Sequence, residues 1–455
     1  MSARSERAGG AALCAALALV QLHAFHWGVV TPDSVVQYGQ ALSGRYDDWH
    51  PPVTAWLWRQ LLHLAPGGAP LLILDVALYW GAIGLISETL RARHGAAAAA
   101  IPILLAALPI PFGQIGALLK DPLMACLMLL ASALLIRRAA GGSGWLTAAA
   151  IPLILLASAT RINALFAALP LLLLAAPRAW TARLGRCAAS AAGALLLLLA
   201  SGWAINDALL KPDHSHPLYS LINFDLAGIV AQGGPSGYPG LSDADARRLT
   251  AHCYDPRLYG AHDAERCAQP EDAIADHVAR NGDSAIGIWL NAVIRAPAAY
   301  LRHRIAHLDW NWRLMVPSVP DDAVYLMSEP NDLGLHFTPN PATRVVAGAA
   351  RIMAWSPLGR PATWLAAALG LLIVAPCLPS RRIVTALAAS ALLYGSAYAL
   401  VSVAPDLRYN LWTMLAAMIG LAIVLAERAA LSWPRRVAAL APAGLVMICE
   451  LVALV

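Results

Sequence analysis

Long apolar runs separated by short polar connections dominate this chain. A helix needs about 20 apolar residues to cross the hydrocarbon core of a bilayer, and many of these runs approach or reach that length. They lie at residues 10–30, 69–91, 96–112, 121–137, 144–159, 162–177, 187–207, 361–378, 383–403, 410–426 and 437–455. The pattern predicts an all-α polytopic membrane protein with about 11 transmembrane helices.

Two longer polar stretches interrupt this pattern. Residues 31–68 begin with Pro32-Asp33-Ser34 and contain two amphipathic segments, which favours helices lying in the membrane interface. Residues 208–360 are too polar for a bilayer and too long for a linker. We therefore expect an N-terminal transmembrane module (1–207) with 31–68 as its first outer loop, an insertion with interfacial helices (208–360), and C-terminal transmembrane helices (361–455).

Arginines occur in alternate connections between the runs. They precede the first run and follow the second, fourth, sixth, eighth and tenth, so they fall on one side of the membrane if the spans are right. The positive-inside rule makes that side cytoplasmic. We expect a multi-pass protein of a bacterial inner membrane, with a cytoplasmic N-terminus and a retained first helix. The loop 31–68 and the insertion then face the periplasm.

Composition supports this class of protein and excludes others. The 455 residues are 59% hydrophobic and only 13% charged, unlike a soluble domain. The formal net charge of +5 does not indicate nucleic-acid binding, because the arginines form short clusters between apolar runs. The sequence contains no Walker motif, dinucleotide fingerprint, HExxH or Gly-x-Ser-x-Gly.

Three short motifs lie on the predicted outer side. They are Asp33 followed by the turn 44–48 and His50-Pro51-Pro52, then Leu119-Lys120-Asp121-Pro122-Leu123, then Asp406-Leu407-Arg408-Tyr409. In this order and placement they resemble the protein O-mannosyltransferase and aminoarabinose-transferase branch of the GT-C glycosyltransferases. The resemblance covers residues 10–210 well and the C-terminal helices loosely.

This resemblance implies a reaction and a set of roles. The family transfers a sugar from a polyprenyl-phosphate donor to an acceptor, here a glycan, lipid or protein, at the outer face. Asp33 stands where the family has its catalytic carboxylate and would act as general base. Many members have Asp-Glu here, whereas this chain has Asp33-Ser34, so a second carboxylate is missing. His50 aligns near the carrier phosphate.

Other outer-face residues are candidates for the same site. Asp121 would be a second active-site acid, and a guanidinium fork matches phosphate oxygens. The candidate ligands of the donor phosphate are His50, Lys120, Arg161, Arg408 and Tyr409, and Asn163 and Asp225 are candidate cleft residues. The structural alternatives are helix caps for Asp33 and Asp121, a snorkelling Lys120, a local Asp406–Arg408 ion pair and core packing around Asp225.

Cysteines and metals add two expectations. Cys253 and Cys267 are the two cysteines of the outer insertion, and we expect them to form a disulfide in an oxidising compartment. No Asp-x-Asp motif lies near Asp33, so we expect no required cofactor, although a divalent metal stays an open alternative.

Two other functions share these features. A lipid or glycan transporter or flippase would use polar groups and broken helices within the membrane, and Pro102, Pro109 and Pro111 favour such a break. An O-antigen-type polymerase or ligase would share the outer-face site and the lipid carrier. For the transferase, the expected partners are a polyprenyl-phosphate-linked sugar donor, a glycan, lipid or protein acceptor, and membrane lipids, with no nucleic acid.

Overall fold

The fold is helical throughout the described chain. The computed structural model describes residues 3–258 and 269–452, where β-pairing is limited to isolated bridges. These residues form two compact units. The first comprises Met1–Asp213, Pro317–Gly395 and Leu407–Val455, and the second comprises His214–Val316 and Ser396–Asp406.

A helix lies on each of the predicted apolar segments. These helices are α1 (Ala3–Ala24), α4 (Ala69–His94), α5 (Ala96–Ala106), α7 (Lys120–Ala139), α8 (Trp145–Ala159), α9 (Ala164–Ala175), α11 (Leu184–Trp203), α18 (Pro361–Val374), α19 (Arg381–Val401), α20 (Leu411–Ala426) and α21 (Trp433–Val452). Among the described residues, five stretches are long and apolar enough to cross a membrane: α4, α7, α11 with its continuation to Leu209, α19, and Leu407–Ala426. These helices support a multi-pass membrane protein, and the count of eleven spans stays a prediction.

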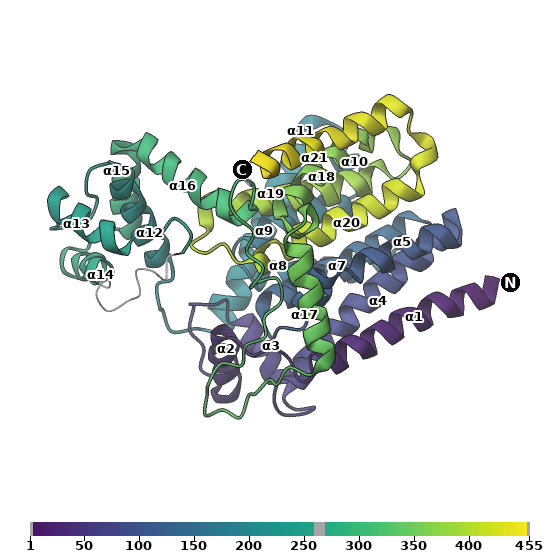
Figure 1. Cartoon of the computed structure of the whole chain (residues 1–455), viewed down its shortest axis with the longest axis horizontal. Helices are drawn as coiled ribbons and strands as arrows, with labels where there is room; N and C mark the ends of the chain where they lie inside the picture. Colours follow the sequence, from purple (N-terminus) through teal and green to yellow (C-terminus); the bar gives the residue numbers. More distant parts are fainter. Residues whose placement is uncertain (1–2, 259–268, 453–455) are drawn as a thin grey trace. The chain divides into compact units, whose positions relative to one another are not determined.

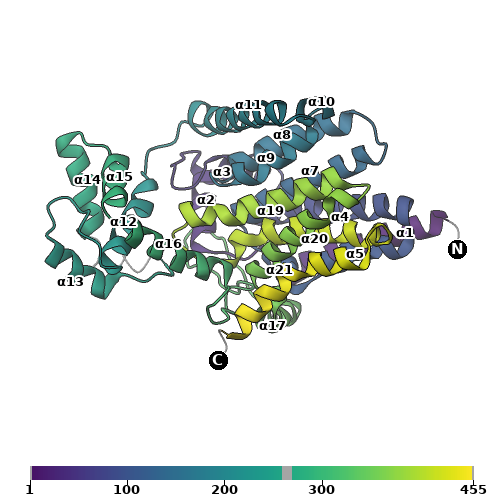
Figure 2. The ribbon, with the colours of Figure 1, turned by 90° about the horizontal axis from the view of Figure 1, so that it is seen from above.

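The helices of the first unit pack in sequence order. Helix α4 packs on α1, α5 and α7, while α7 also contacts α8 (Figures 1 and 2). Helix α11 lies beside α8 and α9, and α18 packs between α20 and α21. In the most apolar window of each helix, 72% of α7 and 78% of the Leu407–Ala426 stretch are buried, against 6% of α11. Helices α7 and α20 therefore form the interior, and α11 exposes an apolar surface suited to lipid.

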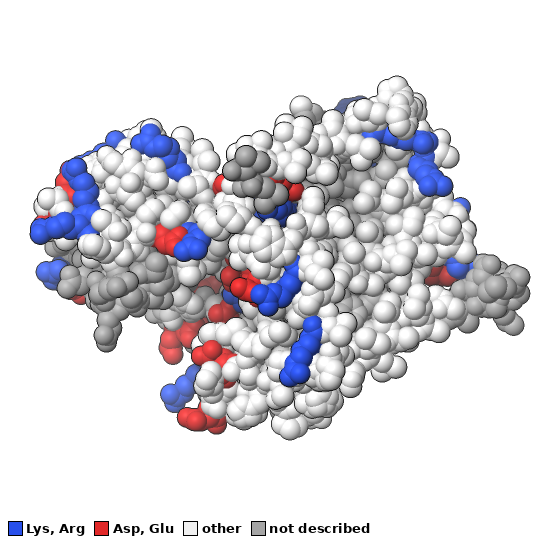
Figure 3. Space-filling model, in the orientation of Figure 1, with Lys and Arg blue, Asp and Glu red and all other residues white. Residues whose placement is uncertain are grey.

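Charged side chains are sparse on the helical surface of the first unit. The face in Figure 3 is mostly uncharged over these helices. Large apolar side chains such as Leu184, Leu196, Trp203 and Leu440 are more than half exposed. An uncharged, apolar exterior is what a helical bundle needs when hydrocarbon surrounds it.

Proline breaks the predicted span 96–112. Helix α5 ends at Ala106, and a short helix, α6 (Pro109–Gln114), follows. The first proline fixes the backbone at the start of α6, and the residue before a proline is driven out of the helical conformation. The first outer loop contains the two expected helices, α2 (Pro32–Ser43) and α3 (Val53–Leu61).

The segment 317–360 belongs with the first unit. In the structure Pro317–Gly395 groups with the first unit, and the second unit includes His214–Val316. The domain bounds expected from the sequence, with an insertion at 208–360, stay a prediction. The Gln114 side chain donates hydrogen bonds of 2.8 Å to the backbone carbonyls of Asp322 and Ala323. Helix α17 (Pro341–Ala354) packs on α6 and α1. These contacts are polar and long-range, so the composition of the segment did not indicate them.

The second unit is built around one central helix, α12 (Leu218–Ala231). It packs against α13 (Asp243–Cys253), α14 (Gln269–Asn281), α15 (Ala285–Arg295) and α16 (Pro297–Trp312). Its apolar side chains join Tyr238 and Tyr300 in one core. Cys253 is disulfide-bonded, and Cys267 lies outside the described residues.

A buried ion pair ties three helices of the second unit together. One oxygen of Asp225 on α12 lies 2.6 Å from Arg304 and 3.1 Å from His303, both on α16. Its other oxygen accepts a 2.7 Å hydrogen bond from Trp289 on α15. Burial alone would raise the pKa of Asp225, but Arg304 and His303 hold it below its usual value. Asp225 therefore acts as a core carboxylate of this unit, whereas its expected role in a cleft stays a prediction.

We predict that Asp225→Asn destabilises the second unit by about 3–5 kcal/mol, because it leaves the Arg304 charge buried without its partner. Amide hydrogen exchange of the full-length protein would measure this as faster exchange in α12 and α16. Asp276→Asn, an exposed position on α14, should change the stability by less than about 0.5 kcal/mol. Equal protection in the two variants would contradict a stabilising role for this pair.

Candidate active site

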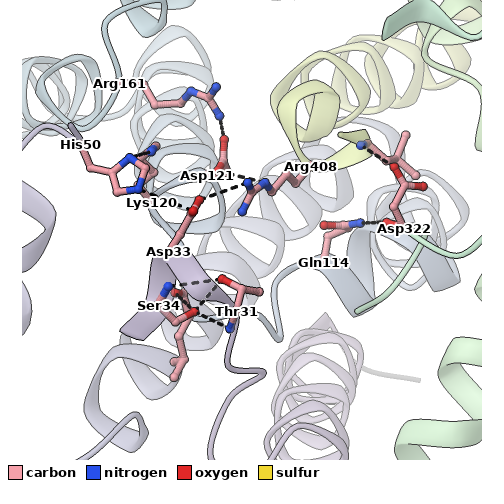
Figure 4. A network of polar contacts seen from close by, with 12 residues as sticks. Thr31, Asp33, Ser34, His50, Gln114, Lys120, Asp121, Arg161, Asp322 and Arg408 are labelled. Atoms are coloured by element: carbon pink, nitrogen blue, oxygen red, sulfur yellow. Dashed lines mark hydrogen bonds and ion pairs between the residues drawn. The ribbon is translucent and has the colours of Figure 1, made fainter. Parts of the chain in front are cut away.

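Six of the candidate side chains meet in the first unit (Figure 4). They come from segments far apart in the sequence: the start of α2, the loop before α3, the start of α7, the turn between α8 and α9, and a 3-10 turn, η6 (Leu407–Asn410). The residues are Asp33, His50, Lys120, Asp121, Arg161 and Arg408.

The cap of α2 leaves the Asp33 side chain available to the site. Thr31 is the N-cap, and its hydroxyl accepts a hydrogen bond from the Ser34 backbone N–H. The Ser34 hydroxyl donates to the Leu118 carbonyl at 2.8 Å. Asp33 lies in the first helical turn, so it is not the cap. Ser34, at the position where the resembled family has a carboxylate, closes the cap and fixes α2 to the loop before α7.

Asp33 lies between a guanidinium and an imidazole. Its Oδ2 is 3.1 Å from Arg408, and its Oδ1 is 3.6 Å from His50 Nε2. Burial alone would raise the pKa of Asp33, but the hydrogen bond from His50 and the charges of Arg408 and Lys120 hold it well below its usual value. The carboxyl is therefore ionised at neutral pH and, at 25% exposure, still open to a substrate.

His50 links Asp33 to Lys120. The Lys120 ammonium contacts His50 Nδ1. Because an ammonium only donates, Nδ1 accepts and the ring proton sits on Nε2, which faces Asp33. Burial lowers the pKa of His50, the Lys120 charge lowers it further, and Asp33 opposes both effects. His50 is therefore neutral at pH 7 and orients both charged neighbours.

Asp121 forms the second half of the cluster. It lies in the first turn of α7, where Leu119 is the N-cap position and provides no side-chain cap. The carboxylate pairs with Arg161, and its Oδ2 is 3.9 Å from Arg408. With 1% of its side chain exposed, Asp121 depends on these guanidinium groups for charge compensation.

Tyr409 and Asn163 orient the arginines. The Arg161 guanidinium lies 4.3 Å from the centre of the Tyr409 ring, a cation–π geometry. Its Nε donates a 3.1 Å hydrogen bond to the Asn163 side chain. The Arg408 guanidinium lies 5.9 Å from the ring centre of Tyr325. Tyr325 was not predicted from the sequence, because it lies in the polar segment 208–360 that was expected to form an insertion.

The charge balance of this cluster favours an anion. Among the described side chains it joins three permanent cations, Lys120, Arg161 and Arg408, to the two carboxylates Asp33 and Asp121. These five side chains sum to one positive charge when His50 is neutral, and the Asp322 carboxylate lies at the neighbouring Leu407 N–H. Two guanidinium forks and an ammonium next to a partly open carboxylate can bind a phosphate beside a general base.

Three residues that support the site were not predicted from the sequence. The Asp322 carboxylate accepts a 3.0 Å hydrogen bond from the Leu407 backbone N–H, and Gln114 holds the Asp322 carbonyl. They fix the turn that carries Arg408. Asn206, in the π-helix η1 (Ala204–Leu209), accepts from Val53 N and donates to the Ala159 carbonyl. The available signals were a single polar residue between apolar residues for Gln114, and the pair Asn206-Asp207 at the end of an apolar run.

A metal is not required to explain these contacts. Among the described residues, no group of three His, Cys, Asp or Glu side chains is placed to hold a metal ion. The charges of the cluster are balanced by lysine and arginine instead. Metal independence nevertheless stays a prediction.

Comparison with known proteins gives weak structural likenesses. No protein-family model matches the sequence, and no curated protein matches it. Crystal structures of ArnT from Cupriavidus metallidurans are similar to this chain: the form bound to undecaprenyl phosphate at 16% identity over 92% of this chain and 78% of that one (TM-score 0.32), and the apo form at 18% identity over 94% and 78% (TM-score 0.30). Similarity this low assigns no family, so the function is inferred from the chain's own side chains.

We predict that Asp33 stays ionised as the pH falls to the ordinary aspartate pKa of about 4, because Arg408 and His50 favour the charged form. Arg408→Gln should move its protonation to higher pH. Subtracting the infrared spectrum of Asp33→Asn from that of the protein with Asp33 isolates the Asp33 carboxyl band. Its intensity as a function of pH measures the protonation of Asp33. Arg344→Gln, an exposed position on α17, is the control and should leave the band unchanged. An unshifted Asp33 titration in Arg408→Gln would rule out this electrostatic coupling.

Proposed function

We propose that this protein is a membrane glycosyltransferase that moves a sugar from a polyprenyl-phosphate donor to a glycan, lipid or protein acceptor. The observation that carries the proposal is the meeting of Asp33 with Lys120, Arg161 and Arg408 at the ends of apolar helices. A lipid-linked phosphate approaches from the membrane, so a phosphate site belongs at this level of a helical bundle. We place the site on the periplasmic side of a bacterial inner membrane.

The proposed reaction assigns a role to each half of the cluster. Asp33 accepts the proton of the acceptor hydroxyl while that oxygen attacks the anomeric carbon of the sugar. The bond from this carbon to the phosphate oxygen breaks, and polyprenyl phosphate leaves. Lys120, Arg161 and Arg408 stabilise the charge on the departing phosphate. Attack opposite the leaving group inverts the anomeric centre, and no metal is needed for charge neutralisation.

The position of the site relative to the arginine-rich connections supports the orientation. Lys120 and Asp121 begin α7, and Arg137 and Arg138 end it. The helix has 20 residues, which corresponds to a length of about 30 Å, the thickness of the hydrocarbon core. With the arginine-rich end in the cytoplasm, the cluster reaches the periplasmic boundary.

A transporter remains the second candidate because of Asp75. This residue lies within α4, is 1% exposed, and neither carboxyl oxygen has a hydrogen-bond partner among the described residues. An ionisable group inside a membrane helix often marks a substrate or ion pathway. Movement of a polyprenyl-linked sugar across proteoliposomes without a new glycosidic bond would favour this function, and growing product chains would favour a polymerase or ligase.

We predict that Asp33→Asn lowers glycosyl transfer by about 10²- to 10⁴-fold, the usual contribution of a general base. The donor should still bind, since the cations remain. Proteoliposomes supplied with polyprenyl-phosphate sugars and an acceptor extract would report transfer by mass spectrometry. Asp332→Asn, an exposed carboxyl of the first unit, is the matched control and should keep full activity. Wild-type turnover in Asp33→Asn would exclude this residue as the base.

We predict that Arg408→Gln weakens binding of polyprenyl phosphate by about 10- to 100-fold, the loss expected for a charge-assisted hydrogen bond. Arg408→Lys should recover part of the affinity, because it restores the charge without the fork. Calorimetric titration in detergent measures both constants. Unchanged affinity in a folded Arg408→Gln protein would place the phosphate elsewhere.

A further inference from the structure

Several arginines line a cavity at the opposite end of the first unit from the candidate site. Arg93, Arg178, Arg381 and Arg382 border a space of about 840 Å³ between the ends of α4, α7 and α19 and the short helix α10 (Arg178–Thr181). Arg138 and Arg382 border an adjoining space of about 610 Å³. Arginines from four of the six arginine-bearing connections thus meet at these two adjoining spaces.

The positive charge of these arginines is not balanced by carboxylates in the cavity lining. Among the described residues that line it there is no aspartate or glutamate. The nearby Glu427 accepts hydrogen bonds from the backbone N–H and the hydroxyl of Ser380, at 3.1 and 2.6 Å. Arg93 donates to the Ala139 carbonyl at 3.2 Å, so its charge is retained at the rim. The site is a concentration of positive charge with an anion as its natural complement.

An apolar groove continues from the same arginines. Arg381, Arg382 and Thr181 also line a third space of about 520 Å³. Its other walls are mainly apolar side chains of α9 and α19, together with Thr385, Pro376 and, from α11, Cys187. Leu173, Leu174 and Leu393 are among these side chains. A soluble anion would make no favourable contact with these apolar side chains. A phospholipid has both an anionic headgroup for the arginines and acyl chains for the apolar groove.

We propose that this cavity and groove bind an anionic phospholipid, with the headgroup phosphate among the arginines and an acyl chain along α9 and α19. Lipid bound here joins the ends of α4, α7, α9 and α19. The site lies about 30 Å from the glycosyl-transfer cluster along α7, so this inference does not depend on the proposed reaction.

Native cysteines provide the readout, because Cys377 lines the arginine cavity and Cys187 lines the apolar groove. Both are free thiols, as is Cys449 on α21, which serves as the internal reference. The full-length protein in detergent would be treated with a small maleimide while phosphatidylglycerol is titrated. Peptide mass spectrometry then gives the labelling of each cysteine.

We expect phosphatidylglycerol to protect Cys377 and Cys187 in a saturable way and to leave Cys449 unchanged. Phosphatidylcholine should protect neither at the same concentration. Arg178→Gln/Arg381→Gln should weaken protection about twenty-five-fold, taking about fivefold for each arginine beside an anionic headgroup. The control Arg428→Gln/Arg435→Gln removes the same charge from exposed positions outside the cavity lining and should behave as wild type.

Three outcomes would overturn the proposal. Equal protection in the Arg178→Gln/Arg381→Gln protein and in wild type would exclude the arginines as ligands, provided that the variant keeps the wild-type unfolding temperature. Equal protection by phosphatidylcholine would indicate unspecific detergent-like binding. If glycerol phosphate protects Cys377 but not Cys187, and does so with the same affinity as phosphatidylglycerol, the ligand would be a soluble anion instead.

Discussion

Charge compensation within a nearly closed cluster is the constraint on which the first unit depends. Asp121 is almost fully buried, and an ionised carboxylate in that position is tolerated only when cations pair with it. Arg161 and Arg408 meet this need from two separate turns, and Arg408 also pairs with Asp33. Each segment that carries one of these charges must therefore be held in place by the rest of the chain.

Long-range polar links provide that placement. Ser34 bonds a carbonyl 84 residues away, Asn206 accepts from a backbone N–H 153 residues away, and Gln114 reaches a carbonyl 208 residues away. These links end at Leu118 before the start of α7, at Val53 at the start of α3, and at Asp322, which bonds the turn of Arg408. Fixed donors and acceptors of this kind reduce the reorganisation needed when a charged ligand arrives.

Local periodicity explains what the sequence could predict. A run of apolar residues specifies a helix by itself, so the predicted segments coincide with helices, and the prolines near 109 marked a break. The arginine alternation placed Arg93, Arg178 and Arg381 together because chain direction reverses at each crossing.

Tertiary contacts explain what the sequence could not predict. The motif residues Asp33, His50, Asp121 and Arg408 were selected by family resemblance, and their distances follow from packing. Asp322 and Tyr325 sit in a polar segment whose composition suggested a separate insertion, and only their partners near Gln114 and Arg408 show where they belong. No local pattern encodes such pairings.

The charges around Asp33 determine when this carboxylate can act as a base. A carboxylate stabilised by Arg408, Lys120 and His50 is ionised but reluctant to accept a proton. A phosphate bound to the same cations competes for their charge, so the stabilisation of Asp33 falls and its basicity rises when the donor is present. Under the proposed function, Asp33 would then become an effective base only after the donor binds. In the absence of the donor, proton transfer to Asp33 is disfavoured by the same interactions that hold the resting site together.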